Sequence, residues 1–587
     1  MLDLKPTPLN VTQEAAHKMP RFLLLALLTI FVLSGLFGRD LWSSAESRLL
    51  AEVVSIDFTD PASWLFPFAS GEIITEQGPL PGWIGAIFTT LFGGLVGELR
   101  AMRLSSILWF AISTFCIWYG TWFLARRHEA QPVEQAFARQ AQYRDFGRLM
   151  ADAATLFFIS IFGIVVKQHE AVFETAELAF SCAAFFGCCW ALTRPYWGSA
   201  LAGFACGASI LCSNLLVGAT VLVGCLMSHI LVRGIGDTSR KIFTTIAVAF
   251  VTFGLWPLVS YLLAGVVAGD YFNLWAQRQI QIVGFFDPQE ILWFIKHFIW
   301  YLCPVWPFAF WAIWMWRKNL TVTHIALPLS FCFAWFVGFM LSSDVAAETL
   351  LSVTIAPLCV LATFGLMACN RSTKSMLELF SVAVFTLALA GVWAYFIAWT
   401  LGFPPKMHWS ILRLTADESV SHAHWVAVVL AAALLAFWLY LCVRRLMRRP
   451  IRFWTGPWLS ASGITVLWIS AVCLFGPVID SNRTFANIAR EMSQELKTMH
   501  FVSGTDCVLA QTLPLSERAA IEWHSGVTLT ASEAASCRFI ISHVSAKRQA
   551  KNPTKAPGFV VLKSFRPRSD TRYLLGPAGP VLIEKQF

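Results

Sequence analysis

Charged residues are scarce for a chain of this length. Only 13% of the 587 residues are Asp, Glu, Lys or Arg, and 57% are hydrophobic. A soluble domain carries about 25% charged residues, so a soluble protein of this size would leave much apolar surface in contact with water. The composition excludes a soluble enzyme, as well as a collagen-like, disordered or coiled-coil chain. It predicts a polytopic membrane protein.

Motifs that define several other protein classes are also absent. The sequence has no GxxxxGK[ST] phosphate loop, no CxxC pair and no Cys/His zinc spacing. Paired half-repeats, which many transporters contain, are not visible. Most of the 15 cysteines lie in or beside apolar segments, where cysteine behaves as a small hydrophobe. Cys507 and Cys537 lie in a polar tail, where they could form a disulfide or stay a buried free pair.

Apolar segments long enough to cross a bilayer, which takes about 20 residues, recur along the chain. We expect about thirteen transmembrane helices, within 21–38, 104–125, 149–166, 176–193, 197–213, 215–232, 242–265, 291–315, 322–341, 347–368, 375–401, 423–443 and 455–478. The stretch 82–97 is short and Gly-rich, and we expect it to lie in the membrane interface. The expected fold is an all-α polytopic bundle over 21–478, followed by a small α/β domain at 479–587.

The distribution of Lys and Arg predicts the orientation of these helices. If 82–97 does not cross, 21 basic residues lie on the side of the N-terminus and nine lie in the loops of the opposite side. Cytoplasmic loops carry the excess of Lys and Arg. We therefore expect a cytoplasmic N-terminus (1–20), a cytoplasmic insert (126–147), an external first loop (39–103) and an external C-terminal domain.

Acidic residues gather on the expected external side. The first loop contains eight acids: Asp40, Glu46, Glu52, Asp57, Asp60, Glu72, Glu76 and Glu98. A second group, at the mouth of the fourth expected span, consists of Glu170, Glu174 and Glu177. A third group, at the mouth of the tenth, consists of Asp344 and Glu348. A single external acid is more often a solvated loop residue. Carboxylates at membrane depth are costly and usually face a protein-lined cavity, so three groups on one side predict a shared, water-filled cavity.

The first loop resembles that of the membrane-embedded GT-C glycosyltransferases, which take a sugar from a polyprenyl phosphate. The most similar group is the bacterial aminoarabinose transferase and protein O-mannosyltransferase superfamily. The matching residues are Leu41, Trp42, Glu46, Arg48, Trp64, Pro67, Gly71, Glu76, Pro79, Leu80, Trp83, Phe92, Gly93, Arg103, Leu104 and Ser105. The thirteen expected spans and the external C-terminal domain agree with this family. The resemblance implies a bacterial inner-membrane protein with a periplasmic C-terminal domain.

Several positions depart from the family pattern. Ala45 stands where the family has an aspartate, and Gln77 replaces a lysine. Glu177 aligns with an aspartate at the mouth of the fourth span, and Ser213-Asn214 stands where Lys-Gly is frequent. These replacements point to a changed substrate, a changed site or lost activity.

The resemblance implies inverting transfer of a sugar from a polyprenyl-phosphate donor to a lipid, glycan or protein acceptor at the periplasmic face. Such a reaction needs a base for the acceptor hydroxyl and cations or donors for the phosphate. We expect Glu46 as the base, with Asp40 as its substitute and Glu76 orienting a substrate. The expected substrate-binding residues are Arg48, Gln77, Lys167, His169, Glu174, Glu177, Arg278 and Asp344.

Other readings of the sequence stay open at this point. A divalent metal between the phosphate and the acids is chemically possible, but no spacing demands it and no metal ligand is assigned. Membrane lipids are expected partners, and nucleic acid is not. The alternative function is a non-catalytic membrane protein, either a transporter or flippase for lipid-linked sugars or a degenerate GT-C partner subunit.

Overall fold

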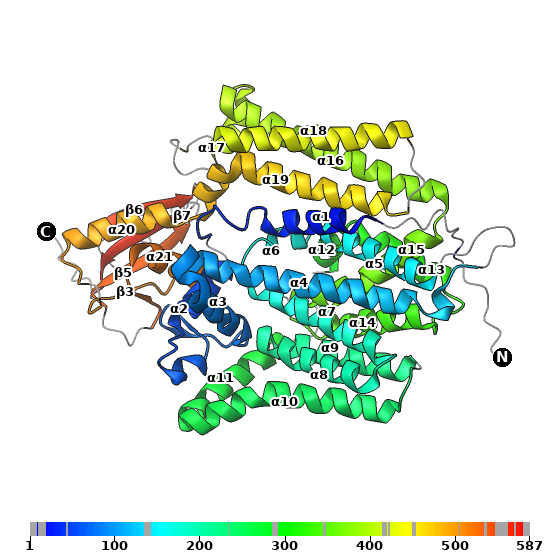
Figure 1. Ribbon diagram of the computed structural model, residues 1–587. Helices are drawn as coiled ribbons and strands as arrows, with labels where there is room; N and C mark the ends of the chain where they lie inside the picture. Colours follow the sequence, from blue (N-terminus) through cyan, green and yellow to red (C-terminus); the bar gives the residue numbers. More distant parts are fainter. Residues whose placement is uncertain are drawn as a thin grey trace.

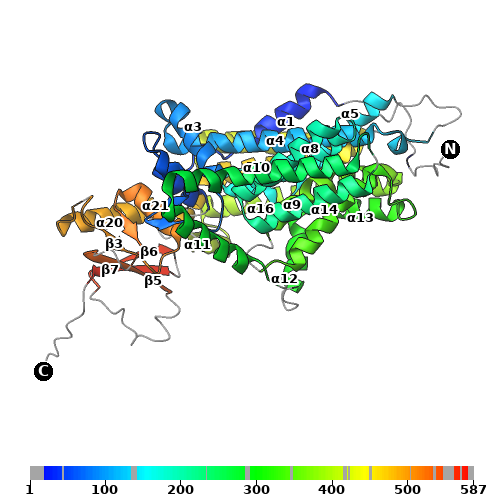
Figure 2. The same ribbon diagram turned by 90° about the horizontal axis from the view of Figure 1, so that it is seen from below.

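The computed structural model describes residues 9, 19–42, 45–133, 142–232, 234–284, 291–343, 348–413, 420, 423–448, 453–502, 504–532, 537–545, 561–568 and 571–578. Its largest part is a bundle of helices that run side by side, and a separate domain with a β-sheet lies at one end of this bundle (Figure 1). The view turned by 90° shows the same division (Figure 2). The expected arrangement of an apolar helical bundle with a terminal α/β domain is confirmed.

Every apolar segment expected to cross the membrane contains helix. The bundle consists of α1 (Arg21–Leu33), α4 (Glu98–Ala125), α5 (Tyr143–Ser160), α7 (Phe173–Ala191), α8 (Pro195–Cys212), α9 (Leu215–Leu231), α10 (Thr238–Ala264), α12 (Ile291–Tyr301), α13 (Val305–Met315), α14 (Thr323–Met340), α15 (Ser352–Ala368), α16 (Arg371–Leu401), α18 (Trp425–Arg448) and α19 (Thr455–Arg483). Among the described helices, seven are long and apolar enough to cross a membrane by themselves: α4, α10, α14, α15 with the turn before it, α16, α18 and α19. The total of thirteen crossings stays a prediction.

The segment 291–315 differs from the continuous helix that its apolar run predicts. It forms α12 and α13, whose axes meet at 94°. Pro304 lies at the break and has no N–H with which to continue the helical hydrogen bonds. Apolar composition alone predicted a straight span because both pieces remain apolar.

The first loop (39–103) folds over the end of the bundle that carries the C-terminal domain (Figure 1). It contains α2 (Ala45–Ser55), the strands β1 (Phe68–Ala69) and β2 (Glu72–Ile73), and α3 (Leu80–Val96), which leads into α4. The hydroxyl of Tyr271, on α11 (Val266–Ile282), donates to the carbonyl of Ile74 at 3.1 Å. The indole of Trp256, on α10, donates to the carbonyl of Leu65 at 2.8 Å. These two hydrogen bonds therefore fix the loop against the bundle.

The C-terminal domain packs two helices against a mixed sheet. The helices are α20 (Ala486–Thr498) and α21 (Leu515–Ser525), and the strand order is β4-β3-β5-β7-β6. The strands are β3 (Val508–Leu509), β4 (Leu529–Thr530), β5 (Phe539–Ser545), β6 (Lys563–Arg568) and β7 (Thr571–Pro577). β3 pairs in parallel with β4 and β5, whereas β7 pairs antiparallel with β5 and β6. The expected small α/β domain is confirmed.

A disulfide joins Cys507 and Cys537, which decides between the two alternatives that the sequence left open. The two cysteines flank the neighbouring strands β3 and β5, and 30 positions of chain separate them. A cross-link of this separation restricts the unfolded domain and thereby stabilises the folded one.

Replacing both Cys507 and Cys537 by serine is expected to lower the stability of this domain by about 3–4 kcal/mol, the loop-closure value for such a separation. The measurement is the urea concentration at which the domain becomes trypsin-sensitive within the full-length protein. The matched control is Cys473→Ser, because Cys473 is a free cysteine. Equal urea midpoints for the double variant and the control would contradict the expectation.

Candidate active site

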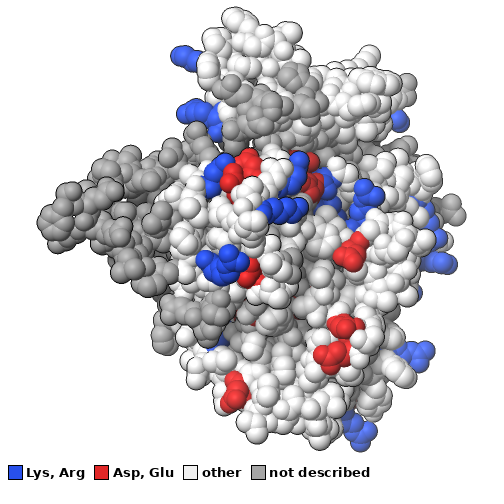
Figure 3. Space-filling model, turned by 90° about the vertical axis from the view of Figure 1, so that its left-hand side faces the viewer, with Lys and Arg blue, Asp and Glu red and all other residues white. Residues whose placement is uncertain are grey.

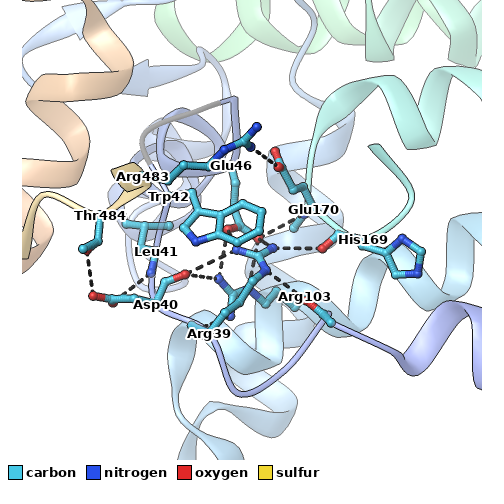
Figure 4. A network of polar contacts seen from close by, with 12 residues as sticks. Arg39, Asp40, Leu41, Trp42, Glu46, Arg103, His169, Glu170, Arg483 and Thr484 are labelled. Atoms are coloured by element: carbon cyan, nitrogen blue, oxygen red, sulfur yellow. Dashed lines mark hydrogen bonds and ion pairs between the residues drawn. The ribbon is translucent and has the colours of Figure 1, made fainter. Parts of the chain in front are cut away.

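Glu46 is the most enclosed acid of the first loop. It lies in the first turn of α2 and is completely buried. Arg39 donates to its two oxygens at 2.7 and 2.9 Å, and Arg103, on α4, donates to both at 2.9 Å (Figure 4). The backbone N–H of Ala171 adds a hydrogen bond of 3.1 Å. Two guanidinium groups thus bind one carboxylate.

This arrangement decides the protonation of Glu46. Burial by itself would raise the pKa of Glu46, but the charges and hydrogen bonds of Arg39 and Arg103 outweigh it and lower the pKa to about 2. A carboxylate with so low a pKa takes up a proton poorly at neutral pH. Glu46 therefore suits the role of a structural anchor better than the role of a base that the sequence suggested.

The same arginines fasten separate segments to one another. Arg103 donates to the carbonyls of Arg39 and Asp40 at 3.0 and 2.9 Å. Arg39 donates to the carbonyl of His169 at 2.9 Å. Through Glu46, the end of the first helix, α2, α4 and the loop before α7 meet at one point (Figure 4).

His169 contributes only this carbonyl to the network, because its side chain points elsewhere (Figure 4). The ring is 1% exposed, and its nitrogens face the carbonyls of Val165 and Phe31. Burial lowers the pKa of His169 to about 4, so the imidazole is neutral at pH 7. A buried neutral ring does not fit the phosphate-binding role that the sequence suggested.

Asp40 lies at the junction between the first loop and the C-terminal domain. Its carboxylate accepts hydrogen bonds from the backbone of Leu41 at 2.8 Å and from the Thr484 hydroxyl at 2.7 Å. His524, on α21, approaches it with Nε2 at 3.6 Å from Oδ1. About a third of the Asp40 side chain remains exposed. Asp40 is therefore open to solvent, although it also ties two parts of the chain together.

Glu76 forms a second cluster with two arginines, at the surface. Arg48, on α2, donates to Oε2 at 2.7 Å, and Arg278, on α11, donates to Oε1 at 2.7 Å. Nearly half of the Glu76 side chain is exposed. We call Arg48, Glu76 and Arg278 the Glu76 cluster. All three were expected site residues, and three separate elements bring them together.

The electrostatics of the Glu76 cluster differ from those around Glu46. Partial burial raises the pKa of Glu76, but Arg48 and Arg278 outweigh it and hold the pKa below its usual value. The Nε–H of Arg48 is buried and has no hydrogen-bond partner. The cluster thus combines solvent access, two cations and an unused donor.

Gln77 points away from its neighbour Glu76. It is 2% exposed and donates to Glu52 at 3.0 Å. Burial raises the pKa of Glu52 to about 8, against the opposing effects of Arg48 and Gln77. A Cβ at Gly78 would lie 2.3 Å from the carbonyl oxygen of Leu211, so this position requires glycine. The tight contact fixes the chain beside Glu76.

Lys167 lies in a third group at the mouth of α7. Its ammonium is 2.9 Å from Glu348 and 3.7 Å from Glu174. Glu177 is fully buried and accepts a hydrogen bond from Ser352. These side chains line a cavity of about 20 Å³, room for a single water molecule. One carboxylate oxygen of Glu174 and one of Glu177 have no partner.

The expected site residues therefore do not form one cluster, because Glu46, Glu76 and Lys167 each have their own ion-pair partners. Asp344 lies outside the described residues. In the part of the chain that the structure describes, no group of three His, Cys, Asp or Glu side chains could hold a metal ion. The surface at this end shows Lys and Arg beside Asp and Glu, without a field of one sign (Figure 3).

Comparisons with known proteins show which solved structures this chain resembles. No family model matches the chain, and no curated protein matches it. ArnT from Cupriavidus metallidurans bound to undecaprenyl phosphate matches over 95% of this chain and 99% of that chain, with 15% identity and a TM-score of 0.62. Its apo form matches over 95% and 98%, with 16% identity and a TM-score of 0.63. The chain has the GT-C fold. An oligosaccharyltransferase from Archaeoglobus fulgidus covers 90% of this chain at 10% identity, with a TM-score of 0.43.

Sequence reasoning missed Arg39 and gave Arg103 no role beyond the family motif. Both are buried basic residues at the edges of apolar segments. Lys and Arg are common beside membrane spans, so neither residue stood out in the sequence. No signal in the sequence singled them out, because the burial of Glu46, which requires cationic partners, is visible only in the structure.

Replacing Glu46 by glutamine is expected to destabilise the protein by about 3–5 kcal/mol, since it leaves two buried arginines without their counter-charge. The measurement is the thermal unfolding temperature in detergent. Glu98→Gln is the matched control, because Glu98 is exposed and lies in the first turn of α4. An unfolding temperature of Glu46→Gln equal to that of the control would contradict the anchoring role.

The same contact predicts a pH dependence. The pKa of Glu46 is lowered to about 2 in the folded chain, against about 4.3 when unfolded. Its contribution is therefore complete above about pH 4.3 and is lost as the pH falls through about 2. Acid unfolding of the wild type and of Glu46→Gln, followed by tryptophan fluorescence, tests this sign. The difference between them should shrink toward low pH.

Proposed function

We propose that the protein is a membrane glycosyltransferase that moves a sugar from a polyprenyl-phosphate donor to a lipid, glycan or protein acceptor. The single observation that supports this most is the Glu76 cluster. Two arginines and an accessible carboxylate lie at the loop-covered end of a GT-C bundle. A sugar phosphate needs this combination of cations and a proton acceptor.

In this proposal the donor phosphate competes with Glu76 for its arginines. A phosphodiester binds arginine with charge-assisted hydrogen bonds, as a carboxylate does. Arg278 and Glu76 are both partly exposed, so a phosphate can approach this pair from solvent. When the phosphate binds Arg48 and Arg278, Glu76 loses its counter-charges, and its pKa rises toward the usual value.

The released carboxylate can then take the proton of the acceptor hydroxyl. The acceptor oxygen forms the new bond to the anomeric carbon, and the bond from that carbon to the phosphate oxygen breaks. The electron pair leaves with the polyprenyl phosphate, whose growing negative charge Arg48 and Arg278 stabilise. Attack from the face opposite the leaving group inverts the anomeric centre. Asp40 is the substitute base, because Glu46 is held by two arginines.

Lys167, Glu174 and Glu177 remain proposed substrate-binding residues. Carboxylate oxygens without partners are suited to accept hydrogen bonds from sugar hydroxyls. The present cavity admits a single water, so sugar binding here requires α7 and the segment at Glu348 to separate. We further propose that the protein lies in a bacterial inner membrane, with a cytoplasmic N-terminus and a periplasmic C-terminal domain.

A second candidate function has its own supporting observation. Ala45 replaces the family aspartate and has no group that can take a proton. Gln77, at the family's lysine position, is engaged with Glu52 in the interior. Both features favour a protein that binds a lipid-linked sugar without transferring it.

Replacing Glu76 by glutamine separates these two functions. Full-length protein in membrane vesicles is supplied with radiolabelled polyprenyl-phosphate sugars, and label in outer-face acceptors is counted. Loss of an acceptor base is expected to lower transfer by about 10²–10⁴-fold, whereas Glu98→Gln should transfer like the wild type. Full transfer by Glu76→Gln would contradict the assignment of Glu76 as the base. Binding of the donor by the wild type without any transfer would favour the second function.

A further inference from the structure

A groove runs along α1 at the opposite end of the bundle from the C-terminal domain. It lies between α1, α4 and α5 and has a free volume of about 490 Å³, within the range of ligand sites in proteins. Its walls are mainly apolar, with Leu24, Leu28, Phe110 and Phe115 among the lining residues. α1 lies at the edge of the bundle (Figure 2), and its apolar side chains Phe22, Leu25 and Ile30 are exposed. Exposed apolar side chains on a helix of a membrane bundle suit contact with lipid.

The charged residues that line this groove are Arg21, Arg148 and Asp152. Arg21 begins α1, and Arg148 and Asp152 lie in α5. Arg148 donates to the carbonyl of Met19 at 3.0 Å and lies 3.8 Å from Asp152. Asp152 also accepts a hydrogen bond from the indole of Trp118 at 2.8 Å. Two arginines and one aspartate leave a surplus of one positive charge.

The length of the groove matches one membrane leaflet. The α1 residues that line it run from Arg21 to Val32, which is about 17 Å at the helical rise of 1.5 Å per residue. Half of the hydrocarbon core measures about 15 Å. A ligand that fits has a negative head group at the arginines and a hydrocarbon chain along α1.

We propose that this groove binds an anionic glycerophospholipid from the leaflet at the N-terminal end of the bundle. The phosphate lies between Arg21 and Arg148, and one acyl chain lies between α1 and α4. The surplus positive charge favours a lipid of net negative charge over a zwitterionic one, because basic residues at a membrane surface attract anionic lipids. This inference does not depend on the proposed transferase activity.

Lipid retention tests the charge part of the proposal. Full-length protein is exchanged into detergent micelles with equal amounts of phosphatidylglycerol and phosphatidylcholine, and bound lipid is counted by native mass spectrometry. The wild type should retain phosphatidylglycerol preferentially, and Arg21→Gln should lower that preference about fivefold. Arg144→Gln is the control, because Arg144 is exposed one turn before Arg148 and does not line the groove. An unchanged preference in Arg21→Gln would overturn the proposal.

Filling the groove tests the location independently of charge. Ala111 lines the groove, whereas Leu108 is an exposed residue of the same helix that does not. Ala111→Trp should lose the retained phosphatidylglycerol, and Leu108→Trp should keep it. Equal retention by the two variants would mean that the lipid adheres to the surface by charge alone, which overturns the groove. A photo-crosslinker at position 111 should capture lipid, and capture of peptide would show that a protein segment occupies the groove instead.

Discussion

The contacts of Arg39 and Arg103 with the buried carboxylate of Glu46 are those on which the end of the bundle beside the C-terminal domain depends. A charge in the protein interior is tolerated only when opposite charges and hydrogen bonds compensate it. The compensation here comes from two other segments, at Arg39 and Arg103. The loop can therefore satisfy Glu46 only when α2 lies against α4. Arg48, two residues further along α2, is thereby held where it meets Glu76.

The C-terminal domain strengthens this arrangement from the other side. Arg518, on α21, pairs with Glu72 of the first loop at 2.6 Å. Ser47, on α2, donates to the carbonyl of Ser516 at 2.6 Å. From the bundle side, Asp480 near the end of α19 accepts a hydrogen bond of 2.7 Å from the indole of Trp42, and Arg39 stacks on the same ring. The C-terminal domain and the bundle thus both bind the first loop. The Glu76 cluster stays partly exposed between these contacts.

The sequence predicted the architecture better than it predicted the roles of side chains. Composition and apolar runs indicated the bundle and the terminal domain, because the length of each apolar run can be counted directly in the sequence. The pairing of Arg48, Glu76 and Arg278 could only be expected as a set of external charges, since α11 is far away in sequence. The direction of each side chain was not readable. Glu46 and His169 face inward, and Gln77 turns away from Glu76, because of partners contributed by distant segments. The break at Pro304 was hidden by the apolar residues on both sides.

Affinity for a polyprenyl phosphate without a sugar tests most directly the claim that the phosphate and Glu76 compete for the same two arginines. It is measured with purified protein in lipid nanodiscs for the wild type, Glu76→Gln and Arg278→Ala. Removing the competing carboxylate should make Glu76→Gln bind more tightly than the wild type, and removing a cation should make Arg278→Ala bind more weakly. Weaker binding by Glu76→Gln, or binding by Arg278→Ala equal to that of the wild type, would contradict the account.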